Sequence, residues 1–200
     1  MKKIGLIALI VVLCLGIIGV GYATWTQAFS IGGTVASGTY IVSIAQTPAT
    51  SVSPTQTVAT CSVGTVVTTG VGAALPISIA NGFPGLTYTI PFTLTATGTV
   101  PAKITGFTFQ DGTGTPVAYT TGNVTFTLSN GGSPADTFAV NAQITGTTVV
   151  GAVIPATNTP ISGTLIVTIP STIENQTIPA TALLSHSGSF NFVVNTAQQY

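Results

Sequence analysis

Apolar and polar side chains alternate along most of the chain beyond residue 33, and a period of two residues predicts β-strands. In the segment 87–97 nearly all the intervening positions are threonine, and the apolar positions are Tyr88, Ile90, Phe92, Leu94 and Ala96. The same alternation returns in the segments 124–129, 138–144, 165–169 and 190–194. Threonine suits the wet face of such a strand because its β-branched side chain favours extended backbone. The pattern therefore predicts sheets that are buried on one face.

Short turn signals separate these segments. They occur at Asn81-Gly82, Pro84-Gly85, Asp111-Gly112, 130–132 and Ser187-Gly188. Strands at such short intervals predict an all-β fold, an antiparallel jelly roll or β-sandwich, in one domain that covers residues 34–200. Pro91 predicts that its strand lies at a sheet edge or contains a bulge, because proline cannot donate a ladder hydrogen bond. We expect residues 47–60, with two prolines, to form a long loop.

The first 23 residues have the features of a signal peptide. Lys2 and Lys3 precede an apolar run from residue 4 to 20, and Gly21-Tyr22-Ala23 places small residues where signal peptidase requires them. We expect residues 1–23 to be removed by cleavage between Ala23 and Thr24, and the rest to be exported. Two alternatives stay open. About 17 apolar residues are just enough for a retained membrane anchor, and a pilin-type cut near the N-terminus would keep the run as a helix.

The composition excludes several functions. The 200 residues include only three basic and three acidic side chains, whereas about 25% of the residues of an ordinary domain are charged. Threonine supplies 38 residues and arginine none. Without clustered cations the chain has no means to bind nucleic acid through its phosphates, and its apolar content excludes intrinsic disorder. After removal of the signal peptide, one lysine stands against three acidic residues, a formal charge of −2.

The sequence contains too few titratable groups for an active site. His186 is the only histidine, in what we interpret as an exposed loop, and Asp111, Asp136 and Glu174 lie in separate segments. Cys61 would be the only cysteine of the exported chain, which leaves neither an intrachain disulfide nor a thiolate metal cluster. We interpret it as a small buried hydrophobe, with an intermolecular disulfide as the alternative. We therefore expect no catalytic residues, no metal, no cofactor and no enzyme activity.

Two N-glycosylation sequons occur in the expected domain. They begin at Asn123 and Asn175. Such triplets also arise by chance in a chain that is rich in asparagine and threonine. Glycans at these positions would help to keep an uncharged surface soluble.

The residues after the expected cut form an amphipathic segment that ends in two glycines. On an extended backbone, Trp25, Phe29 and Ile31 share one face with Gln27, and small or hydroxylated residues lie on the other. Gly32 and Gly33 then interrupt the strand and form a flexible hinge. From the pattern alone, an ordinary first strand within the domain is favoured. The hinge also permits the strand to leave the domain.

Two stretches of the sequence resemble the TasA/camelysin family. The stretch 22–44 is similar to the opening of the family, in which a short strand is followed by a turn, here Ala-Ser-Gly-Thr at 36–39, and a second strand. The stretch 79–94 is similar to the family's Pro-Gly turn before a strand. The resemblance extends over residues 21–109, and the neutral, threonine-rich composition is most similar to that of the archaeal bundling pilins in the family.

This resemblance implies a secreted subunit of a cell-surface filament. It implies a jelly-roll domain that polymerises head to tail by donor-strand complementation, with residues 24–33 as donor strand and hinge. Trp25, Phe29 and Ile31 of one subunit would then be anchored in the next. The implied partner is the chain itself, in filaments that bundle laterally in a biofilm matrix. No nucleic acid is expected, and membrane contact only through an uncleaved signal segment. Some family members are described as peptidases, but one histidine is too few for that activity here.

A second interpretation is a monomeric, exported β-sandwich that binds carbohydrate or accompanies a surface layer. Tyr40, Tyr119 and Tyr200 are its candidates for stacking on sugar rings. The two interpretations differ in oligomeric state, because only the filament requires residues 24–31 (called the arm below) to leave their own domain.

Overall fold

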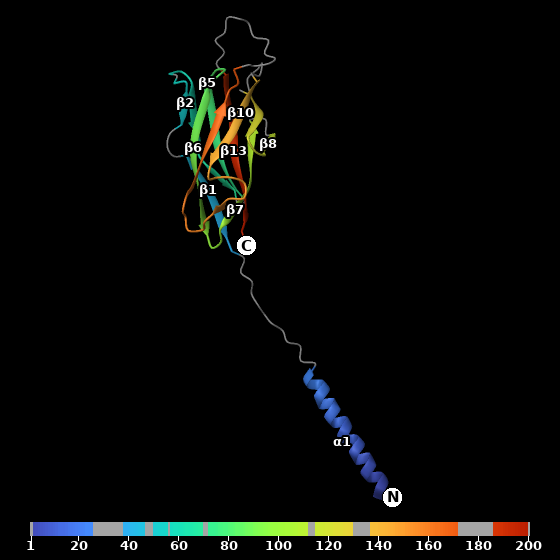
Figure 1. The fold of residues 1–200 in the computed structure, drawn as a ribbon. Coiled ribbons are helices and arrows are strands. Elements are labelled where there is room, and N and C mark those ends of the chain that lie inside the picture. Colours follow the sequence, from blue (N-terminus) through green and yellow to red (C-terminus); the bar gives the residue numbers. More distant parts are fainter. Residues whose placement is uncertain are drawn as a thin grey trace. The chain divides into compact units, whose positions relative to one another are not determined.

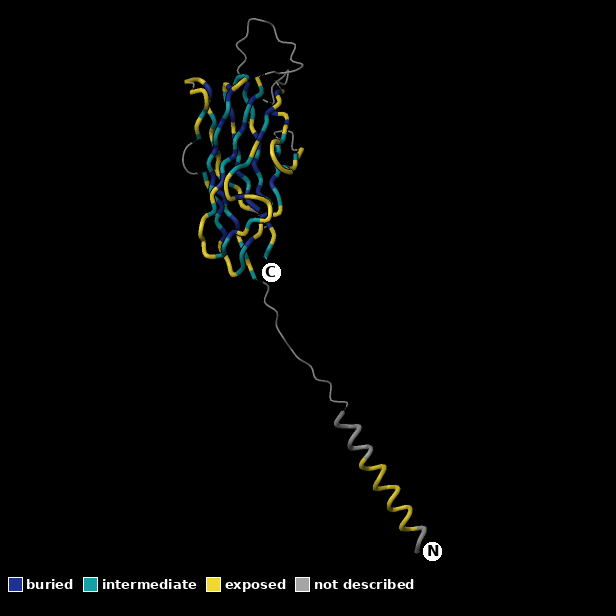
Figure 2. The backbone as a smooth tube through the Cα atoms, viewed as in Figure 1, coloured by how far each residue is buried: buried dark blue, intermediate teal, exposed yellow. Residues whose placement is uncertain are grey.

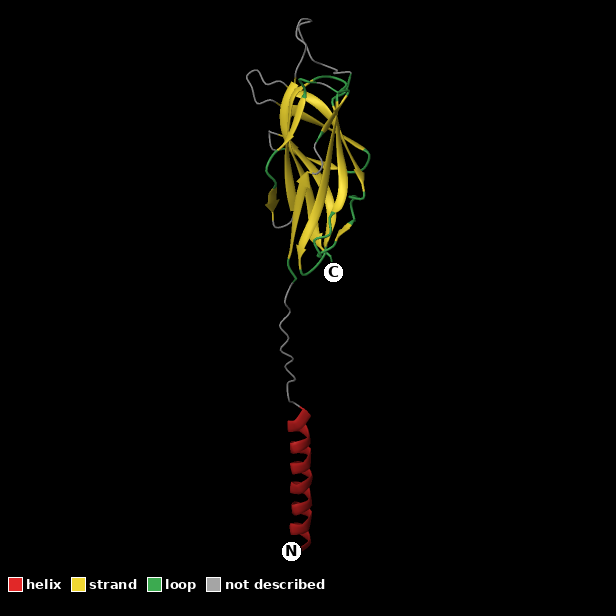
Figure 3. Ribbon diagram, turned by 90° about the vertical axis from the view of Figure 1, so that its left-hand side faces the viewer, coloured by secondary structure: helices red, strands yellow, loops and turns green. Residues whose placement is uncertain are grey.

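A computed structural model of the chain describes residues 2–25, 38–46, 50–55, 57–69, 72–111, 115–129, 137–171 and 186–199. Within these ranges the chain forms one helix and thirteen strands (Figures 1 and 3). The chain divides between residues 37 and 38 into an N-terminal unit, which contains the helix, and a C-terminal unit, which contains the strands.

The helix of the N-terminal unit is α1, Lys2–Trp25. It covers residues 2–23 of the predicted signal peptide and continues for two residues beyond the expected cut. Its described side chains, at positions 5–17, are exposed and almost all apolar. No helix in the described ranges combines the length and the apolar character that crossing a membrane requires.

The strands of the C-terminal unit are short at the sheet edges and long in the sheet centres. Their bounds are β1 Tyr40–Gln46, β2 Ser51–Ser53, β3 Thr60–Val63, β4 Val67–Thr69, β5 Gly72–Gly82, β6 Thr87–Gly98, β7 Ala102–Asp111, β8 Pro116–Tyr119, β9 Asn123–Ser129, β10 Thr137–Gly146, β11 Val153–Ile154, β12 Ile161–Thr168 and β13 His186–Gln198. All the pairings between them are antiparallel. The predicted all-β sandwich is confirmed.

The strands form two sheets that pack face to face (Figure 1). Sheet A has the order β1-β6-β12-β10-β9, and β2 pairs with β6 on the same side as β1. Sheet B has the order β11-β7-β13-β5-β3, with β4 beside β3 on β5 and β8 beside β11 on β7. Most neighbouring strands are distant in the sequence, as in a jelly roll. The sandwich therefore depends on long-range contacts.

The core lies between the sheets and consists of the apolar half of each alternating strand (Figure 2). In β6, each of the five apolar side chains named above is at most 1% exposed. An aromatic cluster lies at the centre of the core. The ring centroid of Phe192 is 5.1 Å from that of Phe92, 5.8 Å from that of Phe107 and 5.6 Å from that of Phe109. Each fully buried side chain of this kind stabilises the fold by about 1.5–3 kcal/mol.

The prediction that Pro91 marks an edge strand or a bulge was wrong, because β6 lies inside sheet A and pairs in register on both sides. β12 pairs along one side of β6, and β1 and β2 share the other side with a break at Pro91. The nitrogen of Thr99 donates to Thr39 O on the β1 side, whereas Ala96 O accepts from the nitrogen of Asn158 on the β12 side. Because backbone groups alternate in direction along a strand, the nitrogen of Pro91 faces the break. No ladder bond is lost there.

Pro76 occupies the equivalent break in sheet B. β3 pairs with residues 77–80 of β5, and β4 pairs with residues 72–74. The nitrogen of Gly64 donates to Pro76 O at 2.8 Å, so the nitrogen of Pro76 also faces this edge and not β13. Each proline is tolerated because it lies opposite two short strands instead of one continuous strand.

Two further predictions need correction. The expected loop at 47–60 contains the short strand β2. Ser187-Gly188, expected to form a turn, lies inside β13 opposite a bulge of β5. Between the pairs His186–Gly82 and Gly188–Ile79, Ser187 alone faces two residues of β5. The signal therefore fell where the ladder is irregular but not at the end of a strand.

The first and last described residues of the sandwich domain lie side by side. Gln198 Nε2 donates to Gly38 O at 3.1 Å, and Tyr40 Oη donates to Thr196 O at 3.2 Å. Nearby, Gly98 has a φ of 146°, and a Cβ at this position would collide with the carbonyl of Thr39. Only glycine therefore allows β6 to end against the start of β1.

Candidate assembly site on the open side of the sandwich

The titratable side chains of the described residues do not converge on one site. No group of three or more His, Cys, Asp or Glu in these ranges could hold a metal ion. Lys103 is exposed in β7, and Asp111 is the last residue of that strand. Asp136 and Glu174 lie outside the described residues. Within the described ranges we therefore find no acid–base arrangement to which a reaction could be assigned.

The prediction of an exposed loop at His186 was wrong. His186 is the first residue of β13 and is only 1% exposed. Its ring stacks on Phe138 of β10, with the ring centroids 4.8 Å apart. The histidine is thus part of the packing between the two sheets. Its neighbours in the sequence, two serines, gave no sign of this long-range contact.

Burial changes the pKa of two groups near β3. Cys61 of β3 lies opposite Ile79, and burial raises the pKa of its thiol to about 12. Burial, with a further effect of Cys61, also raises the pKa of Tyr88 to about 12. The Tyr88 hydroxyl is buried and has no hydrogen-bond partner among the described residues. A thiol that stays protonated is a poor nucleophile, which argues against the alternative of an intermolecular disulfide.

These two groups should make the fold sensitive to alkaline pH. In the unfolded chain the thiol titrates near pH 9.0 and the phenol near pH 10.0, whereas both stay neutral in the folded domain up to about 12. The unfolded state therefore loses its protons first. The contribution of both groups to the free energy of unfolding should be constant below pH 9.0 and should be lost as the pH rises towards 12. Denaturant titrations across this range measure the change.

The double variant Cys61→Ala/Tyr88→Phe provides the control for this prediction. Its free energy of unfolding should depend less steeply on pH than that of the parent over the same range. Equal slopes would contradict the assignment to these two groups.

The predicted residues of the arm and its cleavage site lie at or beyond the end of α1. Ala23, Thr24 and Trp25 are the last three residues of the helix, so the extended backbone expected from residue 24 onward is not found at its first two positions. The remaining predicted anchors and hinge residues lie outside the described residues: Phe29, Ile31, Gly32 and Gly33.

The two sequons differ in what the structure describes. Asn123 is exposed at the first position of β9, and Thr125, the third residue of its sequon, donates its hydroxyl to Asn141 Oδ1 at 2.7 Å. Asn175 lies outside the described residues. Asn123 is therefore accessible to a glycosylating enzyme, and its modification stays a prediction.

The strand β9 forms an edge of sheet A without the usual protection. Its seven residues pair with β10 and with no other described strand. Phe126 and Leu128 are buried on the inner face, and the strand has no charged residue and no proline. Natural edge strands usually carry such residues, or bulges, to prevent pairing with other chains. An extended segment could add to this edge through main-chain hydrogen bonds.

On the same side of the sandwich, the edge of β7 in sheet B is interrupted. β8 pairs with residues 107–110 of β7, and β11 pairs with residues 102–103. Between them, Thr105 is an extra residue in the pairing of β7 with β13. Such a bulge disrupts the regular ladder. The interruption leaves an opening in the edge of sheet B, between β11 and β8.

A loop between β10 and β11, residues 147–152, bounds this opening. Thr147 donates its backbone nitrogen and its hydroxyl to Ser162 O in sheet A, at 3.3 and 2.8 Å. The nitrogen of Gly151 donates to Ile104 O in sheet B at 2.8 Å. The loop is thus tied to both sheets, and its tip is held in place.

A cavity of about 200 Å³ lies between this loop and the turn 120–122 that joins β8 to β9. The side chains of its walls are mainly apolar: Phe107, Tyr119, Ile144, Val149 and Val150. Tyr119 Oη accepts a hydrogen bond from the nitrogen of Ile144 at 3.3 Å. Val149 and Val150, at the loop tip, are 56% and 50% exposed. Exposed apolar side chains beside an apolar cavity are typical of an interaction site.

Sequence reasoning singled out only Tyr119 among these residues. One local signal was present, because the adjacent Val149 and Val150 precede Gly151 in a segment without alternation, where turns are normally polar. The contributions of Phe107 and Ile144 depend on pairing between distant strands and carry no such signal.

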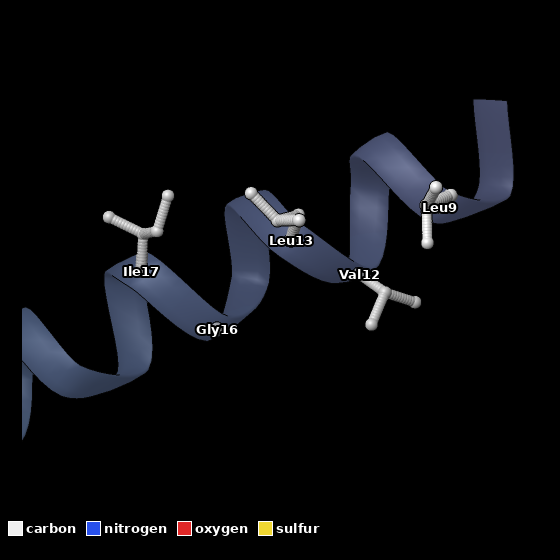
Figure 4. Close-up of a pocket in the computed structure, with 5 residues that line it drawn as sticks. All are labelled: Leu9, Val12, Leu13, Gly16 and Ile17. Atoms are coloured by element: carbon white, nitrogen blue, oxygen red, sulfur yellow. The ribbon is translucent and has the colours of Figure 1, made fainter. Parts of the chain in front are cut away.

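A second hollow lies on α1. Figure 4 shows Leu9, Leu13 and Ile17 along one side of the helix, with Val12 and Gly16 nearby. This hollow is the open surface of a single helix, and no other element encloses it in the described part of the N-terminal unit. We therefore place the candidate site in the sandwich.

The chain matches no protein-family model, no curated protein and no solved structure.

Proposed function

We propose that this protein is a structural subunit of a secreted, extracellular filament and that it polymerises head to tail by donor-strand complementation. The observation that carries the proposal is the uncharged, unprotected edge of β9. The arm, with its alternating apolar residues, is the segment suited to pair with such an edge in another copy. A contact between two different surfaces of the same chain need not close on itself and then generates an open fibre. The resemblance to the TasA/camelysin family supports the same function.

The lack of charge in sheet A supports lateral bundling of such filaments. None of its strands contains a charged residue. Hydroxyl groups on the outer face already bond to one another, as Ser43 Oγ and Thr95 Oγ1 do at 2.6 Å. Two such faces could approach without like-charge repulsion and could share hydrogen bonds or bridging waters.

The free energy that the arm could contribute is large enough for a stable contact between two subunits. Burial of Trp25, Phe29 and Ile31 would contribute roughly 1.5–3 kcal/mol each, so about 5–9 kcal/mol together. Ladder hydrogen bonds would add about 0.5–1.5 kcal/mol each. These terms oppose an association cost of about 4–15 kcal/mol, so both the anchors and the ladder are needed.

The helical backbone at Trp25 is compatible with this proposal. A cut between Ala23 and Thr24 would leave only two residues of α1 on the mature chain. Two residues cannot form a helical turn, because a turn takes about 3.6 residues. The mature arm would then be free to extend as a strand.

The test is a triple variant that keeps the cleavage site intact. Replacement of Trp25, Phe29 and Ile31 by serine removes the three apolar anchors. We expect normal secretion and a folded domain but no filaments, as judged by negative-stain electron microscopy of the cell surface and the medium.

A matched control changes the opposite face of the same segment. The variant Thr26→Ser/Ala28→Ser/Ser30→Ala alters as many residues but leaves the anchors in place, and it should assemble normally. If the anchor variant also forms normal filaments, assembly by this donor strand is wrong.

A monomeric binding module is the second candidate, and one observation favours it. Tyr119 lines the cavity beside Thr120 and Thr121, whose hydroxyl groups could bond to a sugar. Tyr40 is less suited to this role because its hydroxyl already bonds to Thr196 O, and Tyr200 lies outside the described residues. A purified chain that stays monomeric at all concentrations and binds immobilised polysaccharide would favour this function.

A further inference from the structure

We propose that the cavity between the turn 120–122 and the loop 147–152 binds one aromatic side chain of the arm of a second copy of this chain. This inference rests on the proposed function, because it names the place where the donor segment is anchored. It is carried by the size of the cavity, its apolar rim and its position beside the open edge.

The size of the cavity suits one aromatic ring. Its volume is about 200 Å³, and an apolar cavity of about 150 Å³ is known to hold a benzene molecule. The arm has two aromatic residues, Trp25 and Phe29. On an extended strand they are four residues apart and lie about 13 Å from each other on one face. The cavity therefore takes only one of them.

The rim of the cavity suits an uncharged, apolar partner. Val149 and Val150 remain half-exposed although the hydrogen bonds of their loop hold them in place. Among the described residues, no charged side chain lines the cavity. The arm, residues 24–31, also has no charged residue. An apolar ring from this segment would cover the valines without leaving a charge buried.

The cavity lies next to the first residue of β9, at one end of the open edge of that strand. The turn 120–122 leads directly into Asn123, and the pairing of β9 with β10 stops at Asn123 and Gln143. The next residue of β10 is Ile144, whose nitrogen is bound by the hydroxyl of Tyr119. A strand added to β9 would therefore reach the cavity at this end. The same segment could make ladder bonds with β9 and insert its ring beside Tyr119.

The fluorescence of Trp25 provides the test, because it is the only tryptophan in the chain. In the secreted chain, purified after the cut between Ala23 and Thr24, we expect the emission to shift to shorter wavelength as the concentration rises and filaments appear. Val150→Glu should raise the concentration required for assembly at least about tenfold, as the loss of a buried interface anchor does. Sedimentation measures the same threshold independently.

The matched control is Val67→Glu. Val67 is a similarly exposed valine, at 53%, in β4 at the opposite edge of sheet B. This variant introduces the same charge and should assemble like the parent. Trp25→Ala and Phe29→Ala should each raise the threshold, because each removes an anchor. Combined with Val150→Glu, only the variant that removes the ring bound in the cavity should add little, because the two changes then remove the same contact.

Other outcomes would overturn the inference. Normal assembly of Val150→Glu contradicts this anchoring site alone, and so do fully additive effects of the arm and cavity variants. A shifted Trp25 emission that is independent of concentration, but is lost in Val150→Glu, would place the arm in the cavity of its own chain. A parent chain that never assembles would contradict the proposed function itself.

Discussion

Replacement of Phe192 by alanine should lower the free energy of unfolding by about 3–5 kcal/mol. Phe192 is fully buried in β13, the central strand of sheet B, and its ring contacts Phe92 of sheet A across the core and Phe107 and Phe109 on the neighbouring strand β7. The surrounding strands pair on both sides and cannot collapse into the space that is left. For a chain of this size, the midpoint of thermal unfolding should fall by about 6–20 °C. Thermal melts followed by circular dichroism measure this effect.

The control is Val193→Ala on the same strand. The Val193 side chain is half-buried and points to the opposite face of the sheet, because neighbouring side chains alternate. Its loss should cost less than about 1 kcal/mol, since much of the side chain is already in contact with water. Equal costs for the two variants would mean that the aromatic cluster is not the centre of stability.

Three glutamates on the outer face of sheet A should disperse bundles into single filaments. Thr127, Gln143 and Ser162 are exposed on three neighbouring strands, and their replacement by glutamate adds three negative charges to a sheet whose described strands have none. Such charges repeat along the whole length of a filament. Facing surfaces would then repel each other, and added salt should restore contact because it screens the repulsion.

The matched control carries glutamine or asparagine at the same three positions. It has side chains of similar size without the charge, and its filaments should bundle like those of the parent in electron micrographs. Glutamate variants that bundle normally at low salt would show that the absence of charge has another cause than lateral contact.

The regular strands were predictable because their patterns are local. In β6 the alternation of large apolar residues and threonine continues for eleven positions, and the observed strand differs from the predicted segment by one residue. The side chains of β5 are buried to a similar extent as those of β6, but its sequence does not alternate between large apolar residues and threonine. It contains two glycines, three alanines and Pro76, residues with weak strand propensity. Its pairing with β13 and with two short strands stabilises it instead.

The candidate site was less predictable because it is built from distant segments. The cavity is lined by Phe107 of β7, by the end of β8 at Tyr119 and by the loop that contains Val150. Each is unremarkable by itself in the sequence. His186 was misplaced for the same reason, because its contact with Phe138 exists only after both sheets have formed.

The hydrogen bond between Gln198 and Gly38 makes the sandwich suitable for circular permutation. A short linker could join these neighbouring ends, and the chain could be reopened at the exposed Gly85, in the turn between β5 and β6. The rearranged domain would keep every strand pairing but would have no arm. It would offer an acceptor side and no donor, so it could occupy the end of a growing fibre without extending it.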